Sequence, residues 1–405
     1  MNRPRHVAIR RRLLAGLTAA LLLLGGCATA PTEYREPAPL TAASRTERNA
    51  RVFDRAAALI ARRYFDAAFR GIDWPAACAR HRPAALAAPD DDTLYRVLNE
   101  LGRELKESHL VAFSPRRTHE LRTSHRAAIG VRILLAEGRR VVTDLVPGGP
   151  AARAGVQPGW LMVSRDGQPL PEPDTFRPRL GQPVTYGFLD DADQARELTF
   201  NPELIDFSRR EARDLPGGIR YLRFDSFDLA SIRWLSAELK QHRDAPAVIL
   251  DLRQNPGGAT VALALAAEEV FPRRVSVGTH VTRGGRSRER DGLALFPARY
   301  PGRLAVLTSG ATGSAAEILA HVLQHHKRAT IVGQRTAGAV IVSRYHALPD
   351  GGRLQIPEED YLGLDGQRLE GRGVTPDVPV TLALADLRAG RDPALEAARR
   401  LLSQP

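Results

Sequence analysis

The strongest constraint on the fold is an alternation of short apolar runs with helical patterns that begins near residue 216. The apolar runs predict strands at 219–224, 247–252, 304–307 and 329–332, and the helical patterns cover 231–242, 260–270 and 317–327. A chain that alternates in this way forms a largely parallel sheet with helices packed on it. We therefore expect an α/β core with a mainly parallel sheet over residues 206–390, followed by a C-terminal helix over 391–405.

Two further regions precede this core. Residues 46–120 are expected to be helical, because apolar residues such as Val52, Ala56 and Leu59 recur at helical spacing. Residues 121–205 change to a β pattern, with strands expected at 129–133, 141–146 and 160–164. A chain of 405 residues, 43% of them hydrophobic, is long enough for several domains with cores.

Residues 1–26 have the features of a secretory signal. Five arginines precede an apolar run over 13–24, which is shorter than the roughly 20 residues that a spanning helix needs. The run ends in Leu24-Gly25-Gly26-Cys27, which resembles the bacterial lipobox, whose cysteine is acylated. We expect lipid on Cys27 to anchor the chain to a membrane, facing the periplasm, with residues 27–45 as a tether. The resemblance and Ala28 favour the outer membrane; an ordinary signal cleaved near 28–30 is the alternative.

Charge and cysteine content exclude several other classes. The net charge is +12, but the first 26 residues hold five of the arginines, and the others form no basic stripe with interleaved aromatics. No nucleic-acid partner is therefore expected. With Cys27 lipidated, Cys78 has no partner for a disulfide, and its helical setting is typical of a small buried residue.

Ser314 is the most conspicuous candidate for chemistry. It lies in Gly313-Ser314-Ala315-Ala316-Glu317, between a predicted strand and a predicted helix. Such a turn exposes a hydroxyl at the end of a sheet and points the first N–H groups of the helix at its target. A second candidate is the turn at Gly257 and Gly258, which follows the strand at 247–252. It is either an anion-binding nest of backbone N–H groups or an empty tight turn.

Together with Val332-Gly333-Gln334-Arg335-Thr336-Ala337-Gly338, these motifs resemble the superfamily of C-terminal processing and tricorn proteases, serine peptidase family S41. The resemblance covers roughly residues 95–385 and implies a core of the ClpP/crotonase-like kind. Residues 125–170 resemble a PDZ domain, most clearly over 147–156, although Pro158-Gly159-Trp160 departs from its pattern.

The superfamily has two catalytic designs, which differ in the group that activates the serine. In processing proteases it is a lysine just after the Gly-x-x-Thr-x-Gly segment, and here Ala339 holds that position. The chain has only three lysines, and Lys327 lies thirteen residues beyond Ser314 on the same helix, about 20 Å away. Residue identity thus favours the tricorn-like design.

That design implies a role for each matching residue. Ser314 would be the nucleophile and His109 the base, with Ser108 and Glu370 positioning the site. Glu107 departs mildly from the usual aspartate before the Ser-His pair. Glu370 could instead form only a salt bridge with Arg368 or Arg372. The oxyanion donors would be the N–H of Ala315 and that of Gly257 or Gly258.

The partner implied by the resemblance is a polypeptide substrate, with its C-terminus as one expected point of binding. Its docking edge would be the expected strand Ile129-Gly130-Val131-Arg132, by β-augmentation. Neither a metal nor another cofactor is expected, because His321 and His325 lack a third ligand and suit a solvated helix face. The predicted activity is that of a serine endopeptidase acting on envelope proteins or peptides. The alternatives are a catalytically silent protein that binds peptides or ligands, and a scaffold that recruits partners.

Overall fold

The structure is a computed structural model that describes residues 34–123, 125–171, 176, 178–291 and 299–403. The expected signal peptide and Cys27, the expected lipidation site, lie outside these residues. Residues 36–405 form one compact unit. None of the helices in the described ranges is both long and apolar enough to cross a bilayer.

The first part of the described chain is helical. Its helices are α2 (Ala42–Arg63), the short 3₁₀ turn η1 (Phe69–Gly71), α3 (Trp74–Leu86), α4 (Asp91–Arg103) and α5 (Pro115–Thr123). The side chains of Thr41, Asp73 and Asp90 accept backbone N–H groups at the starts of α2, α3 and α4. Such caps satisfy donors that a helix start leaves free. The apolar faces of α2, α3 and α4 form a core that also includes Ala112, Leu354 and Ile356.

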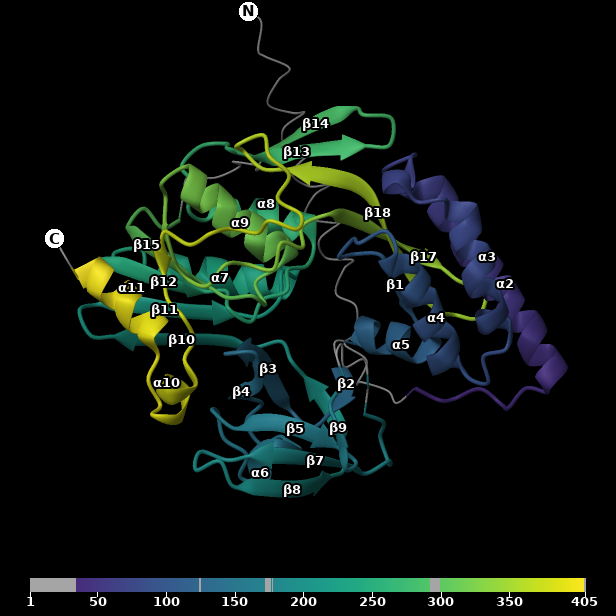
Figure 1. Ribbon diagram of the computed structural model, residues 1–405. Coiled ribbons are helices and arrows are strands. Elements are labelled where there is room, and N and C mark those ends of the chain that lie inside the picture. Colours follow the sequence, from purple (N-terminus) through teal and green to yellow (C-terminus); the bar gives the residue numbers. More distant parts are fainter. Residues whose placement is uncertain (1–33, 124, 172–175, 177, 292–298, 404–405) are drawn as a thin grey trace, which may run out of the picture. The chain divides into compact units, whose positions relative to one another are not determined.

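The core sheet has six strands in the order β10-β11-β12-β15-β16-β19 (Figure 1). Its strands are β10 (Arg210–Leu215), β11 (Ile219–Phe224), β12 (Ala247–Asp251), β15 (Arg303–Thr308), β16 (Thr330–Gly333) and β19 (Val378–Pro379). All neighbouring pairs are parallel except β10 with β11. The expected parallel core is therefore present, with one antiparallel edge.

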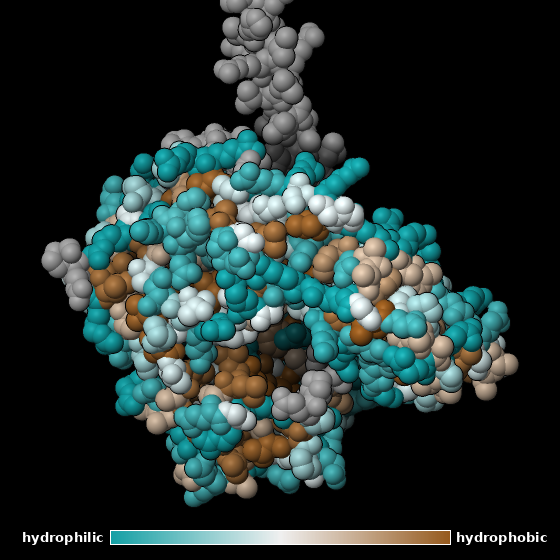
Figure 2. Space-filling view, turned by 45° about the horizontal axis from the view of Figure 1, so that its top comes forward, coloured by the Kyte–Doolittle hydropathy of each residue, from teal (hydrophilic) through white to brown (hydrophobic). Residues whose placement is uncertain are grey.

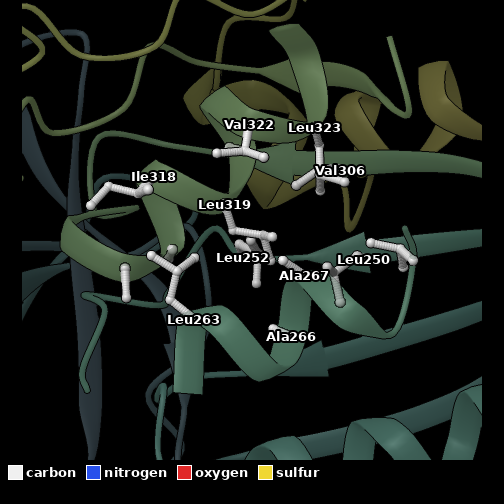
Figure 3. Close-up of a cluster of buried hydrophobic side chains, with 14 of the residues drawn as sticks. Leu250, Leu252, Leu263, Ala266, Ala267, Val306, Ile318, Leu319, Val322 and Leu323 are labelled. Carbon is white, nitrogen blue, oxygen red and sulfur yellow. The ribbon is translucent and has the colours of Figure 1, made fainter. Parts of the chain in front are cut away.

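Helices cover both faces of the core sheet, as the alternation along β12 shows. Val248 and Leu250 belong to one apolar cluster with α7 (Leu229–Gln241), α8 (Thr260–Glu268) and α9 (Ser314–His325) (Figure 3). Ala247 and Ile249 point to the other face, where they pack with α11 (Pro393–Ser403). The short α10 (Leu384–Arg388) precedes α11. Burial on both faces explains why these strands appear in the sequence as continuous apolar runs.

A second sheet was not anticipated. Its five strands are all antiparallel: β1 (Val111–Phe113), β13 (Ser276–Thr282), β14 (Ser287–Asp291), β17 (Val342–Ala347) and β18 (Arg353–Leu362). The expectation of a mainly parallel sheet is therefore wrong for this part of the chain. The available signal was Pro349-Asp350-Gly351-Gly352, a turn sequence, followed by alternating burial along β18.

Residues 129–202 form a separate β domain, bracketed by the antiparallel pair β2 (His125–Ala128) and β9 (Glu203–Asp206). Its sheet contains β3 (Val131–Ala136), β4 (Arg139–Leu145), β5 (Leu161–Arg165), β6 (Gln168–Pro169), β7 (Val184–Leu189) and β8 (Ala195–Phe200), with the short helix α6 (Pro150–Arg153). Aromatic residues fill its core. The sheet is antiparallel, and β3 is one of its edges.

The prediction that residues 129–132 form one strand is only partly correct. Val131 and Arg132 begin β3, but Ile129 and Gly130 precede it. The carbonyl of Gly130 accepts the N–H of Val146, and that of Ile129 accepts the N–H of Ala151. Because both carbonyls are already used, these two residues cannot offer them to an added strand. Gly130 has φ +83°, and its turn breaks the apolar pattern that looked like one continuous strand.

Candidate active site

Ser314 is the first residue of α9, at the carboxyl edge of the core sheet. Its φ is +49°, a left-handed conformation that is unusual for a residue other than glycine. Its N–H donates to the carbonyl of Ala339 at 2.8 Å, and the side chain is half-buried. A strained turn between strand and helix, which costs about 1–3 kcal/mol, is how a nucleophilic serine is commonly presented.

The glycine turn after β12 packs directly against Ser314. A Cβ atom on Gly257 would lie 2.5 Å from the Cβ of Ser314 and 2.8 Å from the nitrogen of Ala315. The buried Asn255 side chain accepts the Gly257 N–H at 2.9 Å, and its backbone carbonyl accepts the Gly313 N–H at 3.1 Å. Asn255 therefore ties the two loops together.

The three predicted oxyanion donors differ in whether their N–H groups already have an acceptor. The N–H of Gly257 is already bonded to Asn255, so of the two glycine candidates it is the less available. Among the residues that the structure describes, no acceptor is found for the N–H of Ala315 or of Gly258. Two free N–H groups on either side of the space beside Gly257 form a suitable cradle for a developing oxyanion.

Ser108 and His109 occupy a turn that follows α4. The hydroxyl of Ser108 lies 2.5 Å from Nδ1 of His109, which leaves Nε2 as the ring nitrogen free for other contacts. The His109 side chain is half-buried. Within the described residues no hydrogen bond joins it to Ser314; catalytic hydrogen bonds are often long before substrate binds.

Glu370 connects the two segments. Its Oε1 accepts the N–H of Ser108 at 3.1 Å, and its Oε2 accepts those of Val340 and Ile341 at 2.6 and 3.0 Å. Val340 follows Ala339, the residue whose carbonyl holds the Ser314 N–H. One buried carboxylate therefore ties the turn that carries His109 to the loop that holds the N–H of Ser314.

The alternative in which Glu370 only forms a salt bridge is wrong. Arg372 pairs with Asp365 at 2.7 Å, and Arg368 pairs with Asp360 and Glu107. Burial lowers the pKa of His109 below its usual value of 6.5, and the charge of Glu370 opposes this shift. The carboxylate thus acts on His109 through its field and through backbone contacts.

Glu317, three residues after Ser314, was not recognised from the sequence as part of the site. It is fully buried, and its carboxylate accepts the hydroxyl of Thr336 and the N–H groups of Gly338 and Ala339, the last two at 2.7 and 3.0 Å. Burial raises its pKa. Glu317 shapes the loop at the position where processing proteases carry a lysine. The three lysines of this chain are all exposed.

The expectation of a solvated face for the histidines of α9 is wrong for His321. This residue is buried, and its Nε2 accepts the N–H of Leu364 at 3.0 Å. Burial lowers its pKa, which suits a neutral acceptor. Over the described part of the chain, no group of three potential ligands is placed to hold a metal ion. Cys78 is half-buried, and burial raises its pKa to about 11, which disfavours a reactive thiolate.

Two known family models match parts of this chain. Residues 218–380 match peptidase family S41, and residues 45–102 match the C1 domain of tricorn protease. The chain is a serine-type peptidase, and its residues 218–380 are similar to family S41. The S41 match contains Ser314, Gly257 and Glu370, whereas the tricorn match ends shortly before Ser108 and His109.

Relatives from both catalytic branches resemble the chain. It is 28% identical over 393 residues to a putative tricorn protease homolog 2 of Streptomyces coelicolor, covering 86% of this chain but only about a third (32%) of that relative. It is 27% identical over 338 residues to a carboxy-terminal-processing protease of Bartonella bacilliformis, covering 78% of this chain and 76% of the relative.

Solved structures agree on the fold. The photosystem II D1 C-terminal processing protease superposes with a TM-score of 0.61 at 22% identity, covering 88% of this chain and 97% of that one. Tricorn protease superposes with a TM-score of 0.54 at 19% identity, covering 88% and 37%. At these identities the likeness shows the mixed α/β S41 protease fold and not the catalytic design.

The glycine turn gives the first test of the site. In Gly257→Ala, we expect covalent labelling of Ser314 by a serine-directed phosphonate to fall at least 100-fold, the order of magnitude for loss of an oxyanion donor, because the new methyl group would fill the space beside Ala315. The matched control is Gly138→Ala, a glycine that also has positive φ but has no atom within 4 Å of an added Cβ. Equal labelling of both variants would contradict the assignment.

The histidine environment gives the second test. Because burial lowers the pKa of His109, we expect the rate of phosphonate labelling to decline on the acid side with an apparent pKa below 6.5. In Glu370→Gln this limb should move to still lower pH, since the charge that stabilises the imidazolium is lost. Labelling rates between about pH 4 and 8 measure both effects. A shift to higher pH in Glu370→Gln would refute this electrostatic role.

Proposed function

We propose that the chain is a serine endopeptidase of the tricorn-like type, with Ser314 as nucleophile and His109 as general base. The observation that carries the proposal is the set of Glu370 contacts, which ties the Ser108 turn to the loop that holds the Ser314 N–H. Ala339 removes the competing lysine. No other residue type in this site has a near-neutral pKa suited to accept a serine proton.

The proposed reaction has two stages, acylation of Ser314 and hydrolysis of the acyl-enzyme. His109 Nε2 takes the proton of the Ser314 hydroxyl as Oγ bonds to the scissile carbonyl carbon. The N–H groups of Ala315 and Gly258 stabilise the oxyanion. His109 then returns the proton to the leaving amine, and a water molecule hydrolyses the acyl-enzyme by the same route. The His109 tautomer with Nδ1–H donating to Ser108 leaves Nε2 free for this work.

The substrate is proposed to be an extended polypeptide. One face of the protein is hollowed, and hydrophobic side chains line part of the hollow (Figure 2). Relatives of both branches are named as proteases, and several are named for processing carboxyl termini. We propose that this chain also acts on polypeptides.

The main test compares active-site variants of the full-length protein. Phosphonate labelling and peptide hydrolysis should be lost in Ser314→Ala and should fall by about 100-fold or more in His109→Ala, the order expected for loss of a general base. His81→Ala is the control, because it removes another part-buried imidazole from the same helical region, one that pairs with Glu104 at 2.7 Å.

Two outcomes would contradict the proposal in different ways. An absence of labelling at Ser314 in the wild type would indicate a catalytically silent binding protein. Undiminished labelling of His109→Ala would leave the nucleophile in place but show that another group is the base.

We also propose that the β domain is a PDZ domain that binds a peptide along β3. β3 is an edge strand, and Leu135 on it is 57% exposed. Arg132 is not available to bind a substrate carboxylate, because it pairs with Asp225 at 2.8 Å. Peptide recognition would therefore depend on backbone pairing and apolar contacts.

This second proposal predicts the behaviour of two matched variants. Leu135→Glu should weaken binding of an apolar C-terminal peptide about tenfold, since burial of one leucine side chain is worth that much or more. Val163→Glu places the same charge at a residue on β5 that is 41% exposed, and it should bind normally. Fluorescence anisotropy with the Ser314→Ala background measures both, and equal affinities would contradict β3 as the docking edge.

A further inference from the structure

Glu107, the residue before Ser108, is a buried charge whose contacts the proposed reaction does not use. Its side chain is 1% exposed. The carboxylate accepts the hydroxyl of Tyr64 at 3.0 Å, Nε of Arg70 at 2.7 Å and an NH2 nitrogen of Arg368 at 2.9 Å. Tyr64 and Arg70 belong to the helical region, whereas Arg368 belongs to the S41 domain.

Through Arg368, this ion pair lies beside the contact between Ser108 and Glu370. Arg368 precedes Glu370 by two residues, and its Nε is held by Asp360 of β18 at 2.8 Å. The turn that carries His109 therefore meets the Glu370 segment at two successive points. Glu107 contacts Arg368 through a charged pair, and the N–H of Ser108 contacts Glu370.

The backbone conformation of the turn explains why Glu107 and Ser108 have different surroundings. Lys106 has φ +54°, a left-handed conformation that bends the chain just after α4. After this bend Glu107 is buried and Ser108 is exposed. A single hydrogen bond between Ser108 and Glu370 would leave the turn free to rotate about it. A second, charged contact one residue away fixes its orientation and hence that of the His109 ring.

We propose that Glu107 is a positioning residue that, through Arg368, orients the His109 turn for proton transfer from Ser314. The inference rests on the proposed function and adds a residue to it. Glu107 does not touch the reacting atoms; it acts on the reaction through the backbone of Ser108 and His109. Its loss should lower the rate of the chemical step and leave peptide binding unchanged.

The chain offers a matched control for a purely structural role. Asp350 is also a fully buried carboxylate that links the helical region to the rest of the unit. It accepts the hydroxyl of Tyr95 at 2.9 Å and pairs with Arg48 at 3.3 Å. It resembles Glu107 in burial and in partners, but it lies in the turn between β17 and β18 and not beside the Ser-His pair.

The experiment measures phosphonate labelling of Ser314 and the separate kcat and KM for peptide hydrolysis in the full-length protein. Glu107→Gln should lower the labelling rate and kcat by about 10–100-fold with KM within about twofold, because only transition-state geometry is affected. Glu107→Asp keeps the carboxylate and should recover most of the rate. Asp350→Asn should lower the melting temperature and leave the labelling rate within about twofold of wild type.

A second variant covers the case in which Glu107→Gln does not fold. Arg368→Lys keeps the positive charge but loses the planar fork that holds Glu107 and Asp360 together, so it should show the same loss of kcat at unchanged KM.

The outcomes separate this inference from the proposed function. If wild type labels at Ser314 and Glu107→Gln labels equally fast, the positioning role is overturned and the peptidase assignment stands. Equal losses of rate in Glu107→Gln and Asp350→Asn would also overturn it, since they would reflect general destabilisation. If wild type does not label at all, the proposed function fails and this inference fails with it.

Discussion

The site depends on one buried carboxylate that accepts three backbone N–H groups from two distant segments. Glu370 binds Ser108 with one oxygen and Val340 and Ile341 with the other. A buried charge is stable only when its hydrogen-bonding capacity is satisfied, and here the donors come from the helical region and from the S41 domain. The cost of burying Glu370 is therefore offset when the two regions meet, which couples assembly of the site to their packing.

A second buried carboxylate, that of Glu317, fixes the loop that holds Ser314. Glu317 holds the loop at Thr336, Gly338 and Ala339, and the carbonyl of Ala339 in turn holds the N–H of Ser314. In a lysine-dependent enzyme this loop would also supply the base. Here Ala339 stands at that position. In the proposed mechanism the base comes from the Ser108 turn, which Glu370 ties to this loop.

Much of the fold could be predicted because parallel strands buried on both faces leave continuous apolar runs between helical patterns. The predicted strand at 219–224 has the same bounds as β11, and the predicted bounds of its neighbours differ from the observed ones by at most one or two residues. The antiparallel sheet could not be predicted in the same way. Its hairpins β13–β14 and β17–β18 are local, but β1 and β18 are more than a hundred residues apart, and only pairing in space shows that these strands form one sheet.

The sequence by itself determined the residue types: a serine in a strand-to-helix turn, a glycine turn, no lysine in place, and a Ser-His pair far upstream. Only the tertiary structure decided how they act, because hydrogen-bond partners depend on contacts that sequence separation hides. It showed that the Gly257 N–H is taken by Asn255 and that the Glu370 carboxylate accepts backbone N–H groups. It also showed that Glu107 is buried against Arg368, which no local pattern reveals because the two residues are 261 positions apart.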